Sequence, residues 1–166
     1  MENNSIQKDL LITDGLKIAS TTILAVKNGR ISEAINDVAT MEIQKEGFGI
    51  NFEQAIVLFL LYYHKGLTQK AIAENLDKDS PSITRLIDIL EEAEMLERRN
   101  DPIDRRAKQI YLTKVGEKIV PDLVRISQKA FSIVFEGVPA EEIKMMQTIL
   151  CKMLENAEAY KKNNAL

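Results

Sequence analysis

The feature that most constrains the fold is one unusually apolar segment near the middle of the chain. Seven consecutive apolar residues run from Ala55 to Leu61, and on a helix they would cover most of the circumference, so we expect this helix to be buried on nearly all sides. Asn51 and Gln54 have the spacing of a capping box, which places the start of the helix at Asn51, and Gly66 ends it. The remaining elements are expected to pack around this helix.

Two short helices separated by a tight turn are predicted next. Thr68 can cap the first, over residues 69–76, and Ser80 and Pro81 begin the second, because proline at the first helical position gives up an amide that has no partner. The second helix has the apolar stripe Ile83, Leu86, Ile87 and Leu90. At 100° per residue Pro81, Arg85 and Asp88 point away from this stripe, with Ser82 and Thr84 on its flanks. This arrangement is typical of a helix-turn-helix.

The sequence then changes to the alternating pattern of strands. Residues 96–99 and 108–112 alternate around the turn formers of residues 100–104, which predicts a β-hairpin. The segment from Leu96 to Lys114 contains six basic and three acidic residues, whereas the formal net charge of the whole chain is -3. Such a local excess beside a polar helix face is what duplex DNA requires, since arginine can enter the minor groove while the helix reaches base edges in the major groove.

Longer helices are expected on both sides of this region. Residues 31–43 have the spacing of an amphipathic helix, whereas residues 6–27 show no clean repeat. Thr113 can cap a further helix, and a last helix begins at about Ala140. Nothing later in the chain can cover the apolar stripe of the last helix, so we expect a second copy of the chain to cover it, with Cys151 in that interface.

Composition excludes several classes of protein. Hydrophobic residues make up 45% and charged residues 28% of the 166 residues, which is ordinary for a globular domain. A single histidine, His64, and a single cysteine leave no zinc ligand set, and there is no Walker loop, nucleophile elbow or dinucleotide fingerprint. We therefore expect no enzyme, no cofactor and no metal. No apolar run is long enough for a membrane helix and the N-terminus lacks a secretory signal, so a cytoplasmic protein is expected.

Several of these segments together resemble the MarR family of bacterial transcription regulators. They are Gly66 to Glu74, Ser82 to Asp88, Leu96 to Arg99, Asp101 to Lys108, and Leu112-Thr113, and close similarity extends over residues 51–118. The resemblance implies a winged-helix homodimer, most simply a repressor, that binds a pseudo-palindromic operator in double-stranded DNA. It also implies release from the operator by a small aromatic or phenolic effector.

Candidate DNA-binding residues follow from matching this pattern position by position. The helix that begins at Ser80 matches the family's recognition helix, and Arg85 is its strongest candidate; the alternative is a surface ion pair of Arg85 with Asp88 or Asp104. In the wing, one of two arginines would enter the minor groove while the other holds Asp104, which is expected to be structural. The predicted DNA contacts are Ser80, Ser82, Thr84, Arg85, Arg105, Arg106 and Lys108.

The predicted fold is mainly α with a small β-hairpin wing: a winged helix-turn-helix domain plus N- and C-terminal dimerisation helices. Residues 1–50 would form the N-terminal helical dimerisation segment, residues 51–113 the DNA-binding region and residues 114–166 the C-terminal dimerisation helices of one intertwined domain. The competing hypothesis is a winged-helix module that binds protein and not DNA. The acidic residues around the recognition helix favour it: Asp77, Asp79, Glu91, Glu92 and Glu94.

Two further expectations concern single positions. Glu94 stands where the family usually has the glycine that ends the recognition helix in a left-handed turn, so a longer or differently ended helix is expected. Phe59, Tyr62 and Tyr63 follow one another at helical spacing, and we expect them to be core residues rather than the wall of a ligand pocket.

Overall fold

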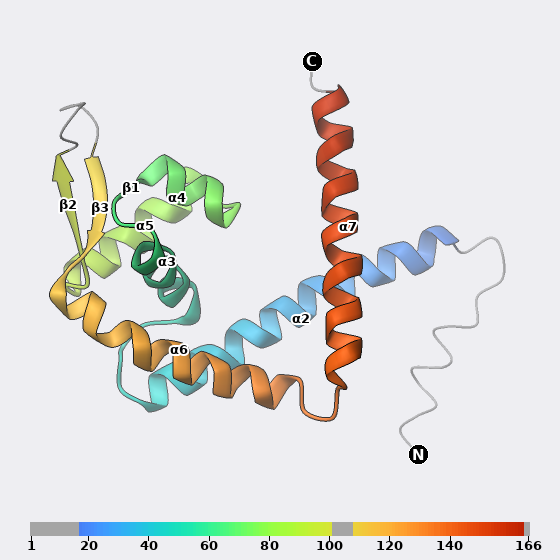
Figure 1. The fold of residues 1–166 in the computed structure, drawn as a ribbon, viewed down its shortest axis with the longest axis horizontal. Helices are drawn as coiled ribbons and strands as arrows, with labels where there is room; N and C mark the ends of the chain where they lie inside the picture. The colour runs from blue at the N-terminus through green and yellow to red at the C-terminus, as the bar shows by residue number, and fades with distance from the viewer. Residues whose placement is uncertain (1–16, 101–107, 165–166) are drawn as a thin grey trace. The chain divides into compact units, whose positions relative to one another are not determined.

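A computed structural model describes residues 17–100 and 108–164, and it has the predicted composition of helices with one small sheet (Figure 1). The chain divides into two compact units, one ending at Phe131 and one beginning at Ser132. The elements of the first unit are α2 (Lys17–Lys45), α3 (Phe52–Tyr63), β1 (Leu67–Thr68), α4 (Gln69–Leu76), α5 (Ser80–Glu92), β2 (Leu96–Asn100), β3 (Lys108–Leu112) and most of α6 (Lys114–Val134). The second unit contains α7 (Ala140–Asn164).

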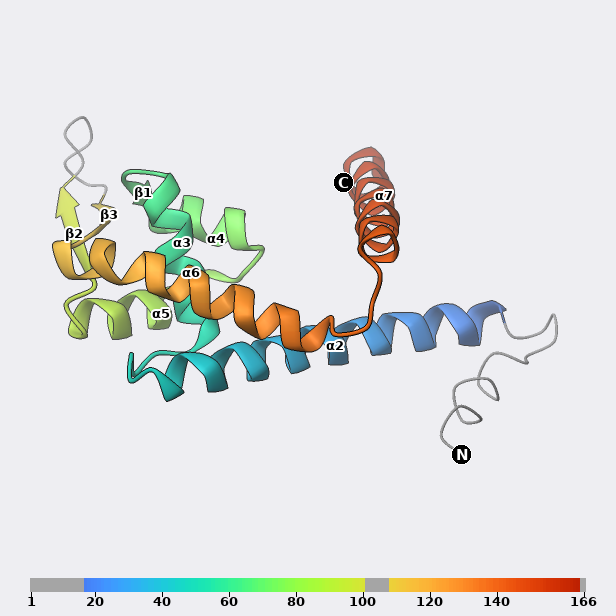
Figure 2. The same ribbon diagram turned by 60° about the horizontal axis from the view of Figure 1, so that its bottom comes forward.

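Helix α3 is the centre of the first unit, as its apolar sequence predicts. It lies among α4, α5 and α6 in both views (Figures 1 and 2). The capping box is confirmed: the Asn51 side chain accepts from the Gln54 amide at 2.9 Å, and the Gln54 side chain accepts from the Asn51 amide at 2.8 Å. The fully buried side chains of this unit include Val57 and Leu58 on α3 itself, Ile83, Ile87 and Leu90 on α5, and Ile110 on β3.

The C-terminal turn of α3 differs from expectation. Phe59 packs against the core, but Tyr62 and Tyr63 are exposed, Tyr63 to 74%, so the prediction that both are core residues is wrong. The two rings, in the last turn of the helix, contact each other edge to face with their centroids 5.7 Å apart. His64 follows as the C-cap residue.

The predicted hairpin belongs to a sheet of three antiparallel strands in the order β1-β3-β2. Strands β2 and β3 pair Leu96 with Leu112, and the two-residue β1, which sequence analysis missed, pairs Leu67 with Ile110. Gly66, with a φ of 78°, allows this pairing, because a Cβ there would lie 2.5 Å from the ring of Tyr111. The short strand therefore joins the end of α3 to the hairpin.

The end of α5 contradicts the expectation for Glu94. The helix ends at Glu92, and Glu94 itself adopts the left-handed conformation with a φ of 56°. The amides of Glu94 and Met95 donate to the carbonyls of Glu91 and Leu90, both at 2.9 Å, which is the Schellman pattern that usually has glycine at this position. Strand β2 begins at Leu96, so the chain must reverse here whatever residue it carries.

Helices α2 and α6 are joined by a buried carboxylate. Glu42 on α2 forms ion pairs with Lys129 on α6 at 2.7 Å and with Lys45 at 2.5 Å. Hydrogen bonds from the ammonium groups of Lys129 and Lys45 lower the pKa of Glu42 to about 2, and the bond from Lys129 has the larger effect. The carboxylate therefore stays charged although its side chain is buried. Helix α2 includes the predicted segment 31–43 and begins earlier, at Lys17.

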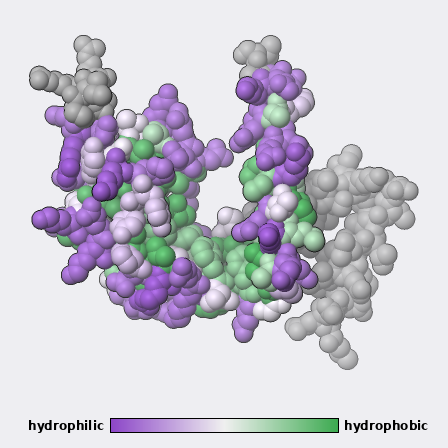
Figure 3. All heavy atoms as spheres, viewed as in Figure 1, coloured by the Kyte–Doolittle hydropathy of each residue, from purple (hydrophilic) through white to green (hydrophobic). Residues whose placement is uncertain are grey.

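Helix α7 has no buried residue in the single chain. Its predicted apolar stripe includes Met146, Ile149, Met153 and Tyr160, all of which are exposed. Apolar side chains interrupt the polar surface of this helix in the space-filling view (Figure 3). Cys151 is exposed as well, and its place in a dimer interface stays a prediction. Among the described residues, no helix is both long and apolar enough to cross a membrane.

The strained turn at Glu94 generates a stability prediction. Replacing Glu94 by glycine should raise the free energy of unfolding by about 1 kcal/mol, because glycine adopts a positive φ without the steric cost of a Cβ. Glu92→Gly, at the last residue of the helix, is the matched control and should lower the free energy of unfolding by about 0.5 to 1 kcal/mol. Urea unfolding monitored by circular dichroism measures both. A Glu94→Gly variant less stable than the wild type would contradict this description of the turn.

Candidate nucleic-acid interface

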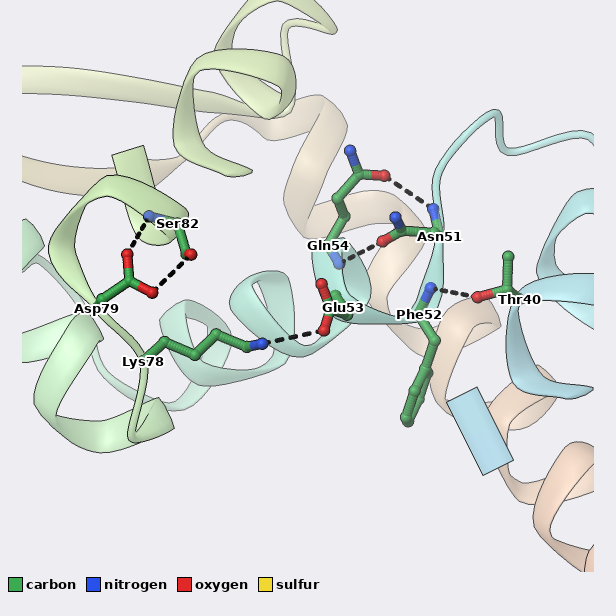
Figure 4. A network of polar contacts seen from close by, with 8 residues as sticks. All are labelled: Thr40, Asn51, Phe52, Glu53, Gln54, Lys78, Asp79 and Ser82. Carbon is green, nitrogen blue, oxygen red and sulfur yellow. Dashed lines mark hydrogen bonds and ion pairs between the residues drawn. The ribbon is translucent and has the colours of Figure 1, made fainter. Parts of the chain in front are cut away.

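The helix-turn-helix is formed by α4 and α5, and local side-chain caps fix the start of both helices. Thr68 accepts from the amide of Ala71 at 3.1 Å, as predicted, and Asp77 makes the left-handed turn that ends α4. Asp79, and not Ser80, is the N-cap of α5: its carboxylate accepts from the amide and from the hydroxyl of Ser82, both at 2.8 Å (Figure 4). Both bonds lower the pKa of Asp79, and the bond from the Ser82 amide has the larger effect.

The turn between the two helices is also tied to α3. Lys78 forms a 2.9 Å ion pair with Glu53 in the first turn of α3, 25 residues away in sequence (Figure 4). The amide of Phe52 in turn donates to the hydroxyl of Thr40 on α2 at 3.0 Å. The helix-turn-helix is thus anchored to the start of the central helix by polar contacts as well as by its apolar stripe.

The outward side of α5 is as the helical wheel predicts. Ile83, Leu86, Ile87 and Leu90 are buried, while Ser80, Pro81, Arg85, Asp88 and Ile89 are exposed. Within residues 17–100 and 108–164 Arg85 forms no ion pair within 4 Å, and the carboxylate of Asp88, which could have held it, binds Arg98 instead. Of the two acidic residues considered as partners of Arg85, Asp104 lies outside the described residues.

Two of the predicted contact residues use their hydroxyl groups within the protein. Thr84 accepts from the Gln69 side-chain amide at 2.5 Å and donates to the Ser80 carbonyl at 2.8 Å, which links α4 to α5. Ser82 donates to Asp79, as described above. Both side chains are half-buried, whereas Ser80 is exposed at the first turn of α5.

The wing is described in its two strands but not in the loop that joins them. Lys108 is exposed at the start of β3, where it pairs in register with Asn100 of β2. Arg105 and Arg106, together with Asp104, fall in the segment 101–107 outside the described residues. The structure therefore places four predicted contacts on α5 and one on β3.

An open groove of about 640 Å³ lies between the end of α3, the sheet and the start of α6. Its walls carry aromatic and cationic groups: Tyr62, Lys65, Arg99 and Tyr111. The guanidinium of Arg99 lies 4.7 Å from the centre of the Tyr111 ring and is paired with Glu97. The sequence does not predict this wall beside Tyr62, because the wall requires the strand register that brings Arg99 beside Tyr111.

Comparison with known proteins agrees with this geometry. The MarR family model matches residues 50–108. The structure of MepR from S. aureus in complex with DNA is 30% identical in sequence, with a TM-score of 0.71, and the match covers 80% of this chain and 96% of that one. The chain belongs to the MarR family. As a MarR-family protein it is a transcriptional regulator and not an enzyme.

Two more distant structures share the MarR fold. The transcriptional regulator SlyA is 24% identical, with a TM-score of 0.73 over 84% of this chain and 96% of that one. A mutant of E. coli MarR in complex with operator DNA is 19% identical, with a TM-score of 0.76 over 83% of this chain and 98% of that one. These matches cover more of the chain than residues 50–108, so the likeness in fold is not limited to the segment that the family model matches.

Proposed function

We propose that this MarR-family protein is a cytoplasmic, homodimeric repressor that binds double-stranded DNA through α5 and the wing. The observation that carries the proposal is Arg85: it is exposed opposite the core stripe of α5 and its charge is not used in an ion pair within the described residues. The relatives solved with DNA, MepR and E. coli MarR, support the same use of this fold.

The hydrogen bonds of α5 assign different tasks to its side chains. Arg85 can donate two hydrogen bonds to the O6 and N7 atoms of guanine in the major groove. Ser80, exposed at the first turn, is suited to a phosphate oxygen. Because the hydroxyl of Thr84 is engaged by Gln69 and by the Ser80 carbonyl, its methyl group is the part left for DNA, and it suits the methyl group of thymine.

Cations of the wing supply the contacts that do not depend on base sequence. We propose that Lys108, at the loop end of β3, binds the phosphate backbone. Arg105 and Arg106, by their match to the family pattern, are proposed to bind the phosphate backbone and the minor groove. Asp104 keeps the structural role that its charge implies, since a carboxylate repels phosphate.

The alternative of a protein-binding module rests on the acidic residues around α5, and the charge of one of these, Glu91, is offset by a cation. Arg98 binds Glu91 together with the nearby Asp88. Asp79 stays charged, but its carboxylate accepts two hydrogen bonds from Ser82 in the N-cap. The acidic character of this side is therefore weaker than the sequence indicates, which favours DNA as the partner.

Duplex binding tests the proposed contacts. Arg85→Ala should weaken operator affinity roughly tenfold or more, the effect of losing a bidentate contact to guanine. The double variant Arg105→Ala/Arg106→Ala should weaken all duplexes alike and reduce the slope of log affinity against log salt by about 0.9 per lost phosphate contact. Arg125→Ala, which removes an exposed arginine from α6, is the matched control and should bind as the wild type does.

The readout is fluorescence anisotropy with an operator selected from a random pool and with random duplex at low salt. Salt-sensitive binding of the wild type to random duplex separates a DNA-binding protein from a protein-binding module, which should show none. If Arg85→Ala and the double wing variant both retain wild-type affinity, the assigned contacts are wrong.

We propose that α7 contributes to the dimer interface through its exposed apolar stripe. Met153→Lys places a charge near the middle of the stripe and should shift the protein from dimer to monomer in sedimentation velocity at micromolar concentration. Thr148→Lys, on the opposite side of the same helix, is the control and should leave the dimer intact. A Met153→Lys protein that remains a dimer would exclude this face from the interface.

Relief of repression by a small aromatic effector completes the proposal, and we place the effector in the groove beside Tyr62 and Tyr111. The groove volume lies within the usual range for small ligands. Lys65 at its wall can bind a carboxylate, whereas Arg99 is already paired with Glu97. Benzoate should lower the duplex affinity of the wild type and have a smaller effect on Lys65→Met, which removes an exposed cation from the wall. An equal effect of benzoate on both proteins would place the effector elsewhere.

A further inference from the structure

Arg98 connects the proposed recognition helix to the wing. It lies on β2, and its guanidinium reaches back to two carboxylates of α5: Nη2 lies 2.6 Å from Oδ1 of Asp88, and Nη1 binds Oε2 of Glu91. The side chain of Arg98 is only 21% exposed, whereas that of Asp88 is 57% exposed. One planar group with two donors thus spans the helix and the strand.

The position of Asp88 makes this bridge relevant to DNA. Asp88 follows Arg85 by three residues, so the two side chains lie on the same exposed side of α5. An unpaired carboxylate there would repel the phosphates that Arg85 must approach. Arg98 offsets this charge, and because guanidinium hydrogen bonds are directional it also fixes the angle between β2 and α5.

We infer that Arg98 is a positioning residue for DNA binding, an inference that rests on the proposed function. It holds the base of the hairpin against α5, so that Arg85 and the wing reach the same duplex together. Both of its terminal nitrogens bind carboxylates, those of Asp88 and Glu91, and the inference assigns Arg98 no contact with DNA.

The test separates positioning from simple electrostatics. The triple variant Arg98→Met/Asp88→Asn/Glu91→Gln removes one cation and two anions, which changes the net charge of this cluster from -1 to 0. Electrostatics alone would make the triple variant bind DNA at least as tightly as the wild type. Loss of positioning should instead weaken duplex affinity roughly 3- to 30-fold, the range seen for residues that act without touching the ligand, and leave the salt slope no smaller.

Lys129→Met is the matched control, because it also removes one cation from an ion pair with a carboxylate, but between α2 and α6. It should bind duplex as the wild type does. Weaker binding by the triple variant alone, with an undiminished salt slope, supports the inference. Affinity equal to or above that of the wild type overturns it, as does an equal loss in Lys129→Met. A salt slope smaller by about one phosphate contact also overturns it, because Arg98 would then touch DNA.

If the triple variant shows no cooperative unfolding transition in urea, it is not natively folded, and the test then rests on Arg98→Lys alone. Lysine keeps the charge but replaces the planar fork by a single ammonium group, so affinity should still fall, and wild-type affinity would overturn the inference. A wild-type protein with no salt-sensitive duplex binding would overturn the proposed function itself, which distinguishes that failure from the failure of the Arg98 bridge.

Discussion

Burial of the apolar residues of α3 is the constraint on which the other elements depend. Val57 and Leu58 are fully buried, and side chains of this size each contribute about 1.5–3 kcal/mol when removed from water. A helix that is apolar on most of its circumference needs partners on several sides, and α5 and the sheet supply them with Ile83, Ile87 and Ile110. The side of α5 that remains exposed is consequently fixed by the burial of the side that faces α3.

Features encoded within a few residues could be predicted from the sequence. The capping box at Asn51, the cap at Thr68 and the alternation of the hairpin each depend on contacts at short separation, where residue type decides the geometry. Helix α5 was predicted together with its exposed and buried sides because a 3.6-residue period gives both at once. The family resemblance added the functional meaning of these elements.

Contacts between distant segments could not be predicted, since they depend on how the elements pack. The two-residue strand β1 has no pattern of its own, and it forms only because β3 offers a free edge to Leu67. Arg98 was counted with the positive charge of the wing, although its guanidinium neutralises two carboxylates of α5. Glu94 adopts a left-handed conformation that glutamate disfavours, because β2 must begin two residues later.

Which candidate residues are available to DNA also depends on packing that the sequence does not reveal. The sequence identified Ser82 and Thr84 as polar residues beside the exposed side of α5, but not that Asp79 and Gln69 already bind their hydroxyl groups. Arg85 was assigned to the exposed side by the helical period, and the structure agrees. Which polar group is available to a partner is thus a property of the folded neighbourhood.

The junction between α5, β2 and α6 has a consequence for how this wing can vary. The Thr113 hydroxyl donates to the Glu94 carbonyl at 2.6 Å and accepts from the Gly116 amide at 3.1 Å, while a Cβ at Gly116 would lie 2.2 Å from the Met95 carbonyl oxygen. Neither an inserted residue nor a larger side chain fits there without separating the three elements. A hairpin of different length would therefore have to gain or lose residues away from this junction, so that α5 keeps its place.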